Sequence, residues 1–408
     1  MIRLFLSAKV ISLLGDALLL LAFPLMVFKK TGLAQNIALT MSVELSLYAV
    51  TTLFSGALVD RSDCKKLCLW LDVGRGVLML AVTQLFSHHF SFGLALAFSA
   101  LMSVLSAIYS SAFDTLPHVI FEQDAHGKVV GYFQSLNQLA LLSGSALAGA
   151  AISMLGTEMA FVIDGLTFFI SAILLSRLQV PVQPHHVSLR AIFKRPKQIL
   201  SDSLEGFKIV SANELIRQTL FLALALNIFS GAKETLWLPL LTKLGATPLE
   251  MGLSNSLLGL VFILATLGAS RFIPVKREAW RIWLVLSQAA AVLACLLLAT
   301  MASVNWIQMM LAGTLLHIGL ALHSFVSTVL RRTEIPAEFA GRSLAAARVL
   351  SRVAAPLGMF GATGLMSVQE YNVIFQIMLF FLVTLSFLPV LNLLKKGYIH
   401  ADSAESTG

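Results

Sequence analysis

Residues 4–28 read LFLSAKVISLLGDALLLLAFPLMVF. This predominantly apolar stretch exceeds the length of about 18 residues that crosses a bilayer core of about 30 Å. About twelve such stretches follow one another along the 408-residue chain. Hydrophobic residues make up 57% of the chain, charged residues only 12%, and the mean hydropathy is +0.85. A soluble domain would not bury that much apolar surface, so we predict an all-α, polytopic membrane protein.

The apolar stretches predict twelve transmembrane helices, at residues 4–28, 36–59, 67–87, 91–113, 129–155, 158–178, 216–242, 249–271, 280–301, 305–330, 342–366 and 371–394. Basic residues gather in the even-numbered loops, at Arg61, Lys65, Lys66, Lys128, Arg190, Lys194, Arg195, Lys197, Lys276, Arg277, Arg331 and Arg332. The opposite loops carry almost none, with Lys29, Lys30 and Lys243 as exceptions. The positive-inside rule therefore predicts that both termini of this multi-pass protein lie in the cytoplasm, and we expect it in the bacterial inner membrane. Because the net charge of +8 is dispersed over these loops, it indicates topology rather than nucleic-acid binding.

A polar segment rich in Arg and Lys separates two halves of six predicted spans each. We predict an N-terminal six-helix bundle over 1–178, a cytoplasmic linker over 179–215, a C-terminal six-helix bundle over 216–396 and a disordered tail over 397–408.

The two halves read as a diverged repeat. Span 1 contains Gly15-Asp16, Phe23-Pro24-Leu25 and Thr31-Gly32-Leu33, and span 7 contains Gly231-Ala232, Leu238-Pro239-Leu240 and Leu244-Gly245-Ala246. Span 5 has GSALAG at 144–149, and span 11 has APLG at 355–358. Repeats of this kind are a common way to build transporters, so the two bundles are expected to be pseudo-symmetric.

The loop between spans 2 and 3 reads GALVDRSDCKK, residues 56–66. Here the chain resembles the major facilitator superfamily, whose cytoplasmic signature has a glycine, an Asp-Arg pair and paired basic residues. The resemblance implies a gating or structural role for Gly56, Asp60, Arg61 and Lys65. Glycine allows close helix packing, and the basic residues are expected to bridge to an acid on another helix, for which Asp114 is the candidate.

A second resemblance concerns export. Gly144 and Gly149 of span 5 are similar to the family's antiporter motif, and LGDA at 14–17 adds to the likeness. Together they resemble the twelve-span exporter group that includes macrolide efflux pumps and the enterobactin exporter. The chain departs from the family patterns at Asp63, where many members have glycine, and at Ser145, which replaces a proline of the antiporter motif.

Ionisable residues inside the membrane are expensive, so they are candidates for function. Asp16 lies about twelve residues into span 1, roughly 18 Å deep at 1.5 Å per residue. It is therefore the candidate for proton coupling, with a structural acid bonded to neighbouring helices as the alternative. Glu44, in the outer half of span 2, is expected to serve in gating or packing. Asp164 lies on span 6, which is peripheral in the family that the chain resembles.

The C-terminal half carries candidate substrate-binding residues. Arg348 and Arg352 share one face of span 11 and suit carboxylates or phosphates, unless they pair internally with Asp16 or Glu234. Lys233 lies in the outer half of span 7 and either binds substrate or forms a gating ion pair with Glu234. His317, near the middle of span 10, is a further candidate, with a hydrogen-bonded core histidine as the alternative.

These residues predict a secondary active transporter, and neither an enzyme nor a cofactor or metal site, since no P-loop, nucleophile elbow or zinc signature is present. The expected partners are a small-molecule substrate, protons and the lipid bilayer, and the chain is expected to be a monomer. The membrane arginines favour proton-driven export of an anionic, siderophore-like metabolite. The alternatives are multidrug or macrolide efflux and lysophospholipid transport.

Overall fold

The computed structural model describes residues 2–59, 62–120, 123–178, 213–273, 277–301, 303, 305–334, 354–366 and 368–405. Throughout these ranges the regular structure is helical. Nine helices of the described chain are long and apolar enough to cross a membrane. The predicted all-α, polytopic membrane fold is thereby confirmed. The residues fall into two compact units, Met1–Pro196 with Gly245–Leu257 and Lys197–Leu244 with Leu258–Gly408.

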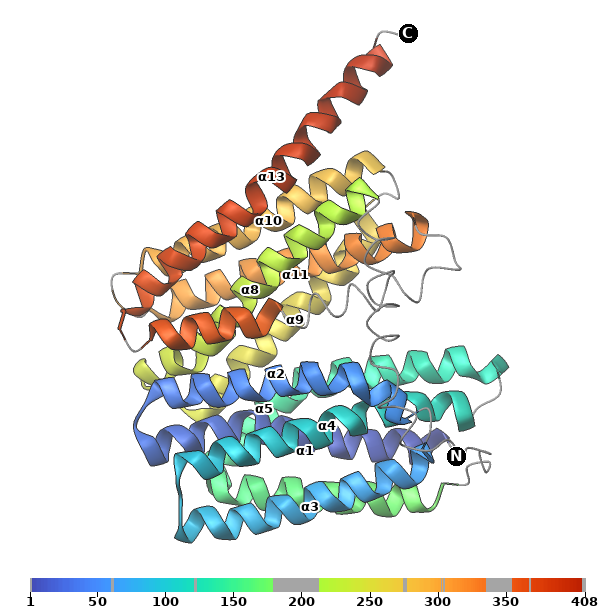
Figure 1. Ribbon diagram of the computed structural model, residues 1–408, viewed down its shortest axis with the longest axis vertical. Coiled ribbons are helices and arrows are strands. Elements are labelled where there is room, and N and C mark those ends of the chain that lie inside the picture. The colour runs from blue at the N-terminus through green and yellow to red at the C-terminus, as the bar shows by residue number, and fades with distance from the viewer. Residues whose placement is uncertain are drawn as a thin grey trace. The chain divides into compact units, whose positions relative to one another are not determined.

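The first unit is a bundle of long helices that run alongside one another (Figure 1). It contains α1 (Ile2–Thr31), α2 (Ala34–Val59), α3 (Cys64–His88), α4 (Phe92–Ile120) and α5 (Gln123–Ser176). α5 is interrupted at Gly156, where φ of 83° and ψ of 167° suit only glycine. The predicted spans 129–155 and 158–178 are therefore the two limbs of α5, joined by this turn.

Side-chain hydroxyls fasten neighbouring helices of the first unit together. Ser99 of α4 donates to the carbonyl oxygen of Thr40 on α2 at 3.2 Å, and Ser103 donates to that of Glu44 at 2.5 Å. The two donors are four residues apart on α4, and their acceptors follow in the same order four residues apart on α2. The two helices therefore run parallel and in matching register. Such polar contacts hold helices together where lipid supplies no hydrophobic driving force between them.

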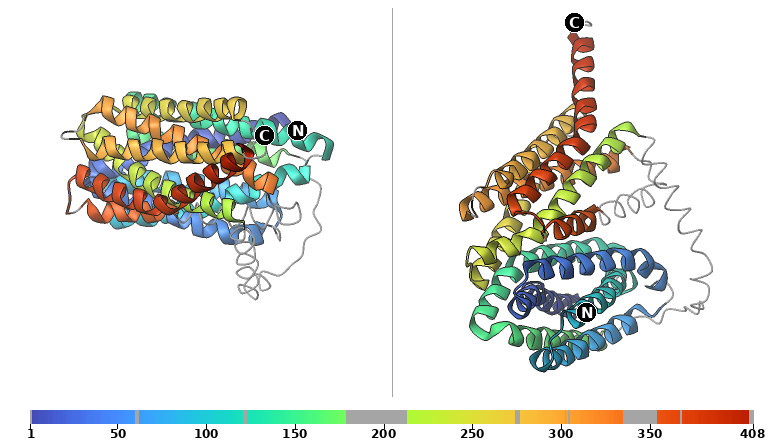
Figure 2. Two further views of the ribbon diagram at one scale, coloured as in Figure 1. Left: turned by 90° about the horizontal axis from the view of Figure 1, so that it is seen from above. Right: turned by 60° about the vertical axis from the view of Figure 1, so that its left-hand side comes forward.

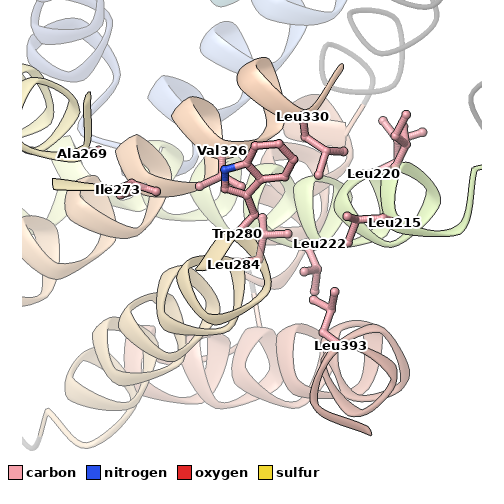
Figure 3. Packing of buried hydrophobic residues seen from close by; sticks show 11 residues of the cluster. Leu215, Leu220, Leu222, Ala269, Ile273, Trp280, Leu284, Val326, Leu330 and Leu393 are labelled. Carbon is pink, nitrogen blue, oxygen red and sulfur yellow. The ribbon is translucent and has the colours of Figure 1, made fainter. Parts of the chain in front are cut away.

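The second unit contains α8 (Glu214–Lys243), α9 (Pro248–Phe272) from Leu258 onward, α10 (Arg277–Ala299), α11 (Trp306–Glu334), the helical segment 354–365 and α13 (Tyr371–Glu405). Asn213 begins α8 by accepting hydrogen bonds from the backbone N–H groups of Leu215 and Ile216 at 3.0 and 3.2 Å. Figure 3 shows the apolar core of this unit, in which Trp280 of α10 packs among leucines and valines from α8, α11 and α13.

The internal repeat appears in the backbone. α1 and α8 each contain a proline near the C-terminal end, Pro24 and Pro239. Each helix is followed by a glycine with positive φ, 68° at Gly32 and 73° at Gly245, which is the usual way to end a helix. The two pseudo-symmetric halves predicted from these motifs therefore share the same local structure.

The repeat also appears in the packing of small residues. In the first unit, a Cβ added to Gly144 of α5 would lie 2.6 Å from the Cβ of Ala17 on α1. In the second, a Cβ on Gly358 would overlap the carbonyl oxygen of Ile228 on α8, and one on Gly231 would overlap that of Ala355. Span 1 therefore packs on span 5 as span 7 packs on the segment 354–365.

Several predictions of chain organisation fall beyond the described ranges. Residues 179–212 of the predicted linker and residues 342–353 of the predicted span 342–366 lie outside them. At the C-terminus, α13 continues as helix to Glu405, through residues for which the sequence predicts a disordered tail. Its end extends past the other helices of the second unit (Figure 2). Alanine and glutamate at 401, 404 and 405 favour helix, which explains why the helix does not end at 397.

Candidate functional site

An ion-pair network joins α1 and α3 of the first unit. Arg75 of α3 bonds through Nη2 to Asp72, one turn earlier on the same helix, and its Nη1 lies 3.7 Å from Oδ1 of Asp16 on α1. Ser171 of α5 donates a hydrogen bond of 2.7 Å to the other oxygen of Asp72. Arg75 therefore links an acid on its own helix to the acid predicted for proton coupling.

Aromatic rings fix the position of the guanidinium. The Cζ of Arg75 lies 3.9 Å from the ring centroid of Tyr109 on α4 and 4.1 Å from that of Phe168 on α5. A planar guanidinium between two rings gains cation–π attraction, which grows as water is removed. Three helices thus hold Arg75, and only 1% of its side chain is exposed.

The two side chains of the Asp16–Arg75 pair differ in their exposed fraction. The Asp16 side chain is 40% exposed, whereas Arg75 and Asp72 are fully buried. Lys9, two turns before Asp16 on α1, is also buried and points its ammonium at the ring of Phe113, 4.9 Å away. Among Asp16, Asp72 and Arg75, the side chain of Asp16 is therefore the most exposed.

Asp164 of α5 is fully buried beside the same network. Its Oδ1 accepts a bond of 3.4 Å from Thr167, and its Oδ2 has no hydrogen-bond partner among the described residues. A Cβ on Gly15 would overlap both Asp164 and Thr167, so the absence of a side chain at 15 brings α1 against this acid. Three carboxyl groups (Asp16, Asp72 and Asp164) thus lie near two basic side chains (Arg75 and Lys9).

The second unit has its own charged group. Lys233 of α8 lies with Nζ 3.2 Å from Oε2 of Glu234 and 4.2 Å from the ring centroid of Trp237. The Lys233 side chain is 2% exposed and that of Glu234 is 45% exposed. His317 of α11 lies within electrostatic range of both, and its Nδ1 is 2.7 Å from the carbonyl oxygen of Gly313. The structure thus brings together three predicted residues, Lys233, Glu234 and His317.

Other predicted residues lie apart or outside the described ranges. Asp60, Arg61, Arg348 and Arg352 fall outside them, and Gly56 lies in α2 without a described environment. Asp114 is exposed near the end of α4. Glu44 is half-buried on α2, within electrostatic range of Asp16.

Lys65 contacts backbone where the sequence predicts a bridge to an acid. Its Nζ donates to the carbonyl oxygens of Ser176 and Leu178, at 2.9 and 2.6 Å. These carbonyls close the second limb of α5, where a cation offsets the negative end of the helix. Asp63, which departs from the family pattern, begins α3 by accepting a bond of 3.1 Å from the backbone N–H of Lys66.

Gly149 of the predicted antiporter motif lies against the start of α9, within the first unit. A Cβ on Gly149 would overlap the carbonyl oxygen of Pro248, and the backbone N–H of Ala146 donates to Oγ of Ser256 at 3.0 Å. Together with Gly144 against Ala17, these contacts show that the motif supplies close helix packing.

Sequence reasoning missed Lys9, Asp72 and Arg75. The signal was present, because Asp72 and Arg75 are three residues apart in the middle of span 3, where charges are costly. An acid and a base at this spacing share one helix face and neutralise one another. Nothing in the local sequence indicated that Asp16, on another helix, would join them.

The Major Facilitator Superfamily matches residues 5–359. BacE of Bacillus subtilis (strain 168), a proposed bacilysin exporter, is 25% identical over 183 residues, which cover 44% of this chain and 43% of BacE. The multidrug efflux pump Tap of Mycobacterium tuberculosis (strain ATCC 25618 / H37Rv) is 23% identical over 215 residues, 51% of this chain and 50% of Tap. The match thus spans about half the length of these curated relatives.

Solved structures show the same fold at low sequence identity. The crystal structure of a bacterial homologue of the iron transporter ferroportin has a TM-score of 0.68 and 14% identity, and covers 97% of this chain and 98% of that one. The POT family transporter PepTSo has a TM-score of 0.72 and 11% identity, with 98% of each chain covered.

Proposed function

This chain belongs to the major facilitator superfamily, and we propose that it is a proton-driven exporter of small organic molecules. It is a multi-pass membrane transporter and not an enzyme. The inner membrane as its location, cytoplasmic termini and a monomeric state are part of the same proposal. Rocking of the two halves would expose a binding site to each side of the membrane in turn.

Export is supported by the relatives, because BacE and Tap are both described as moving molecules out of the cell. Their names give bacilysin and multiple drugs as cargo. The siderophore hypothesis depended on Arg348 and Arg352, which lie outside the described residues, and neither relative carries such a description. We therefore place multidrug-type efflux first.

Proton coupling rests on one observation, the sharing of Arg75 between accessible Asp16 and buried Asp72. When Asp16 on α1 is ionised, it attracts Arg75 on α3. Protonation of Asp16 removes that attraction, and Arg75 is left with Asp72 alone. A proton at an accessible carboxyl thus changes the force between two helices, which is what coupling to a conformational change requires.

The test is pH-driven transport by the purified chain in proteoliposomes. With an acidic interior, the wild type should accumulate ethidium or erythromycin as protons leave. Asp16→Asn cannot release a proton, so its pH-driven accumulation should fall at least tenfold while ethidium binding stays measurable. Glu158→Gln, an exposed acid on α5 away from the network, is the matched control and should transport normally. Full transport by Asp16→Asn would remove this residue from the mechanism.

A further inference from the structure

The ion pair on α8 exposes only its acidic member. The ammonium of Lys233 is enclosed by Glu234 and by the face of Trp237, at 3.2 and 4.2 Å, and its side chain is 2% exposed. Glu234, at 45% exposed, keeps carboxylate surface available. The hydroxyl of Thr235 and the indole N–H of Trp237 are buried, so they present no donor at this surface.

His317 adds a second acceptor. The carbonyl oxygen of Gly313 can only accept a hydrogen bond, so Nδ1 of His317, 2.7 Å away, must carry the proton. In the neutral imidazole, Nε2 then has a free lone pair and accepts hydrogen bonds. The side chain is half-buried and lies within electrostatic range of Glu234. Glu234 and Nε2 of His317 are thus both hydrogen-bond acceptors, and the carboxylate of Glu234 carries a charge.

We propose that Glu234 and His317 form an amine-binding surface, which holds a protonated amine of the transported molecule. The inference deepens the proposed function and rests on it. An ammonium group leaving water loses its hydration, and a carboxylate with a second acceptor replaces it with charge-assisted hydrogen bonds. An anionic group would meet like charge there, because Lys233 is already paired and buried. Amine-bearing substrates are therefore favoured over acidic ones by this surface.

The first unit repeats the arrangement independently. On α1, the helix that corresponds to α8 in the repeat, Asp16 is 40% exposed while its partner Arg75 is 1% exposed. In both units the base is buried and the acid is accessible. In each of these two described pairs, the exposed charge is therefore negative, whereas the positive charges predicted on span 11 lie outside the described residues.

Two fluorescent probes with the same body separate the alternatives. Dansylcadaverine ends in a primary amine, and dansyl-6-aminohexanoic acid ends in a carboxylate on a chain of equal length. Fluorescence anisotropy with the full chain in nanodiscs should show at least tenfold tighter binding of the amine. Glu234→Gln should weaken amine binding at least tenfold and leave acid binding unchanged or stronger. His317→Gln should weaken amine binding by a smaller factor.

Two further variants serve as controls. Glu250→Gln changes an exposed acid that caps α9 by accepting from Thr247 at 2.7 Å, and it should bind both probes like the wild type. Because Glu234→Gln leaves Lys233 without its counter-ion, the double variant Lys233→Met/Glu234→Gln removes both charges, and it should also lose amine preference.

The proposal is overturned if the wild type binds the acid probe as tightly as the amine probe, or binds no amine probe. It is also overturned if both Glu234 variants retain full amine affinity. If the wild type prefers the acid probe and Arg352→Gln loses that preference, the result would instead support the siderophore hypothesis. Acid-probe export driven by a pH gradient would refute this inference and leave the proposed function intact. Amine binding without pH-driven transport of any probe would support this inference and refute the proposed function.

Discussion

At the level of single residues, Arg75 concentrates the electrostatics of the first unit. A guanidinium that is 1% exposed would be very costly without compensation, and here two carboxylates and two aromatic rings provide it. Removal of one partner of a buried pair leaves an uncompensated charge. A single substitution in the network should therefore destabilise the protein more than a double substitution that removes both partners.

Arg75→Met should therefore destabilise the protein by about 3–5 kcal/mol, because it leaves Asp72 buried without a cation. The double variant Arg75→Met/Asp72→Asn should recover a large part of the loss, since it buries no lone charge. Thermal unfolding in detergent measures both, with Arg271→Met on the exposed end of α9 as the control. Equal melting temperatures for the single and double variants would contradict a paired network.

At the level of helices, close crossings set which side chains can meet. Gly76 of α3 and Gly165 of α5 lie against one another: a Cβ on Gly76 would be 2.9 Å from the ring of Phe169 and 3.1 Å from the carbonyl oxygen of Gly165. Along α3, the crossing at Gly76 lies between Asp72, which contacts Ser171 of α5, and Met79. It thereby holds α3 in the register that places Asp72 within 2.7 Å of Ser171.

Gly76→Ala tests this crossing. The added methyl group must displace Phe169 or separate the two backbones, and overpacking of this kind costs about 1–3 kcal/mol. Gly74→Ala on the same helix is the matched control, because its Cβ would have no neighbour within 4 Å and alanine favours helix. Thermal unfolding should rank Gly76→Ala below the wild type and Gly74→Ala at or above it. If both variants melt alike, the crossing is not tight.

At the level of the whole molecule, the transporter must exchange between states open to either side. The GALVDRSDCKK loop is the predicted lock for one of them, and its described part is anchored: Asp63 begins α3, and Lys65 closes α5. We therefore expect this loop to move with the first unit as a rigid piece.

Asp60→Ala should shift the population toward the state open to the cytoplasm, by about 1–3 kcal/mol, the usual size of a conformational coupling. The measurement is labelling of a cysteine introduced at Asn227 of α8 by a membrane-impermeant reagent added from the cytoplasmic side. Cys64, Cys68 and Cys295, all buried, are replaced first so that only the reporter reacts. Unchanged labelling would show that Asp60 does not bias the two states.

The sequence by itself determined the membrane fold, the repeat and the positions of costly charges. These features are local: an apolar span, a glycine after a helix or an acid at 16 is readable wherever it stands, because the bilayer penalises each residue separately. An ion pair between Lys233 and Glu234 was among the expectations drawn in this way, whereas the approach of His317 to them was not.

Only the tertiary structure decided which charges pair and which member of each pair remains accessible. Arg75 meets Asp16, and Lys233 rather than Glu234 is buried, because helix rotation and register bring them there. That rotation follows from contacts between residues far apart in the chain, such as Gly76 with Gly165 and Gly15 with Asp164. A pattern of residues along one helix carries no information about the face that its neighbour will cover. Helix packing therefore decided which charge of each pair remained exposed.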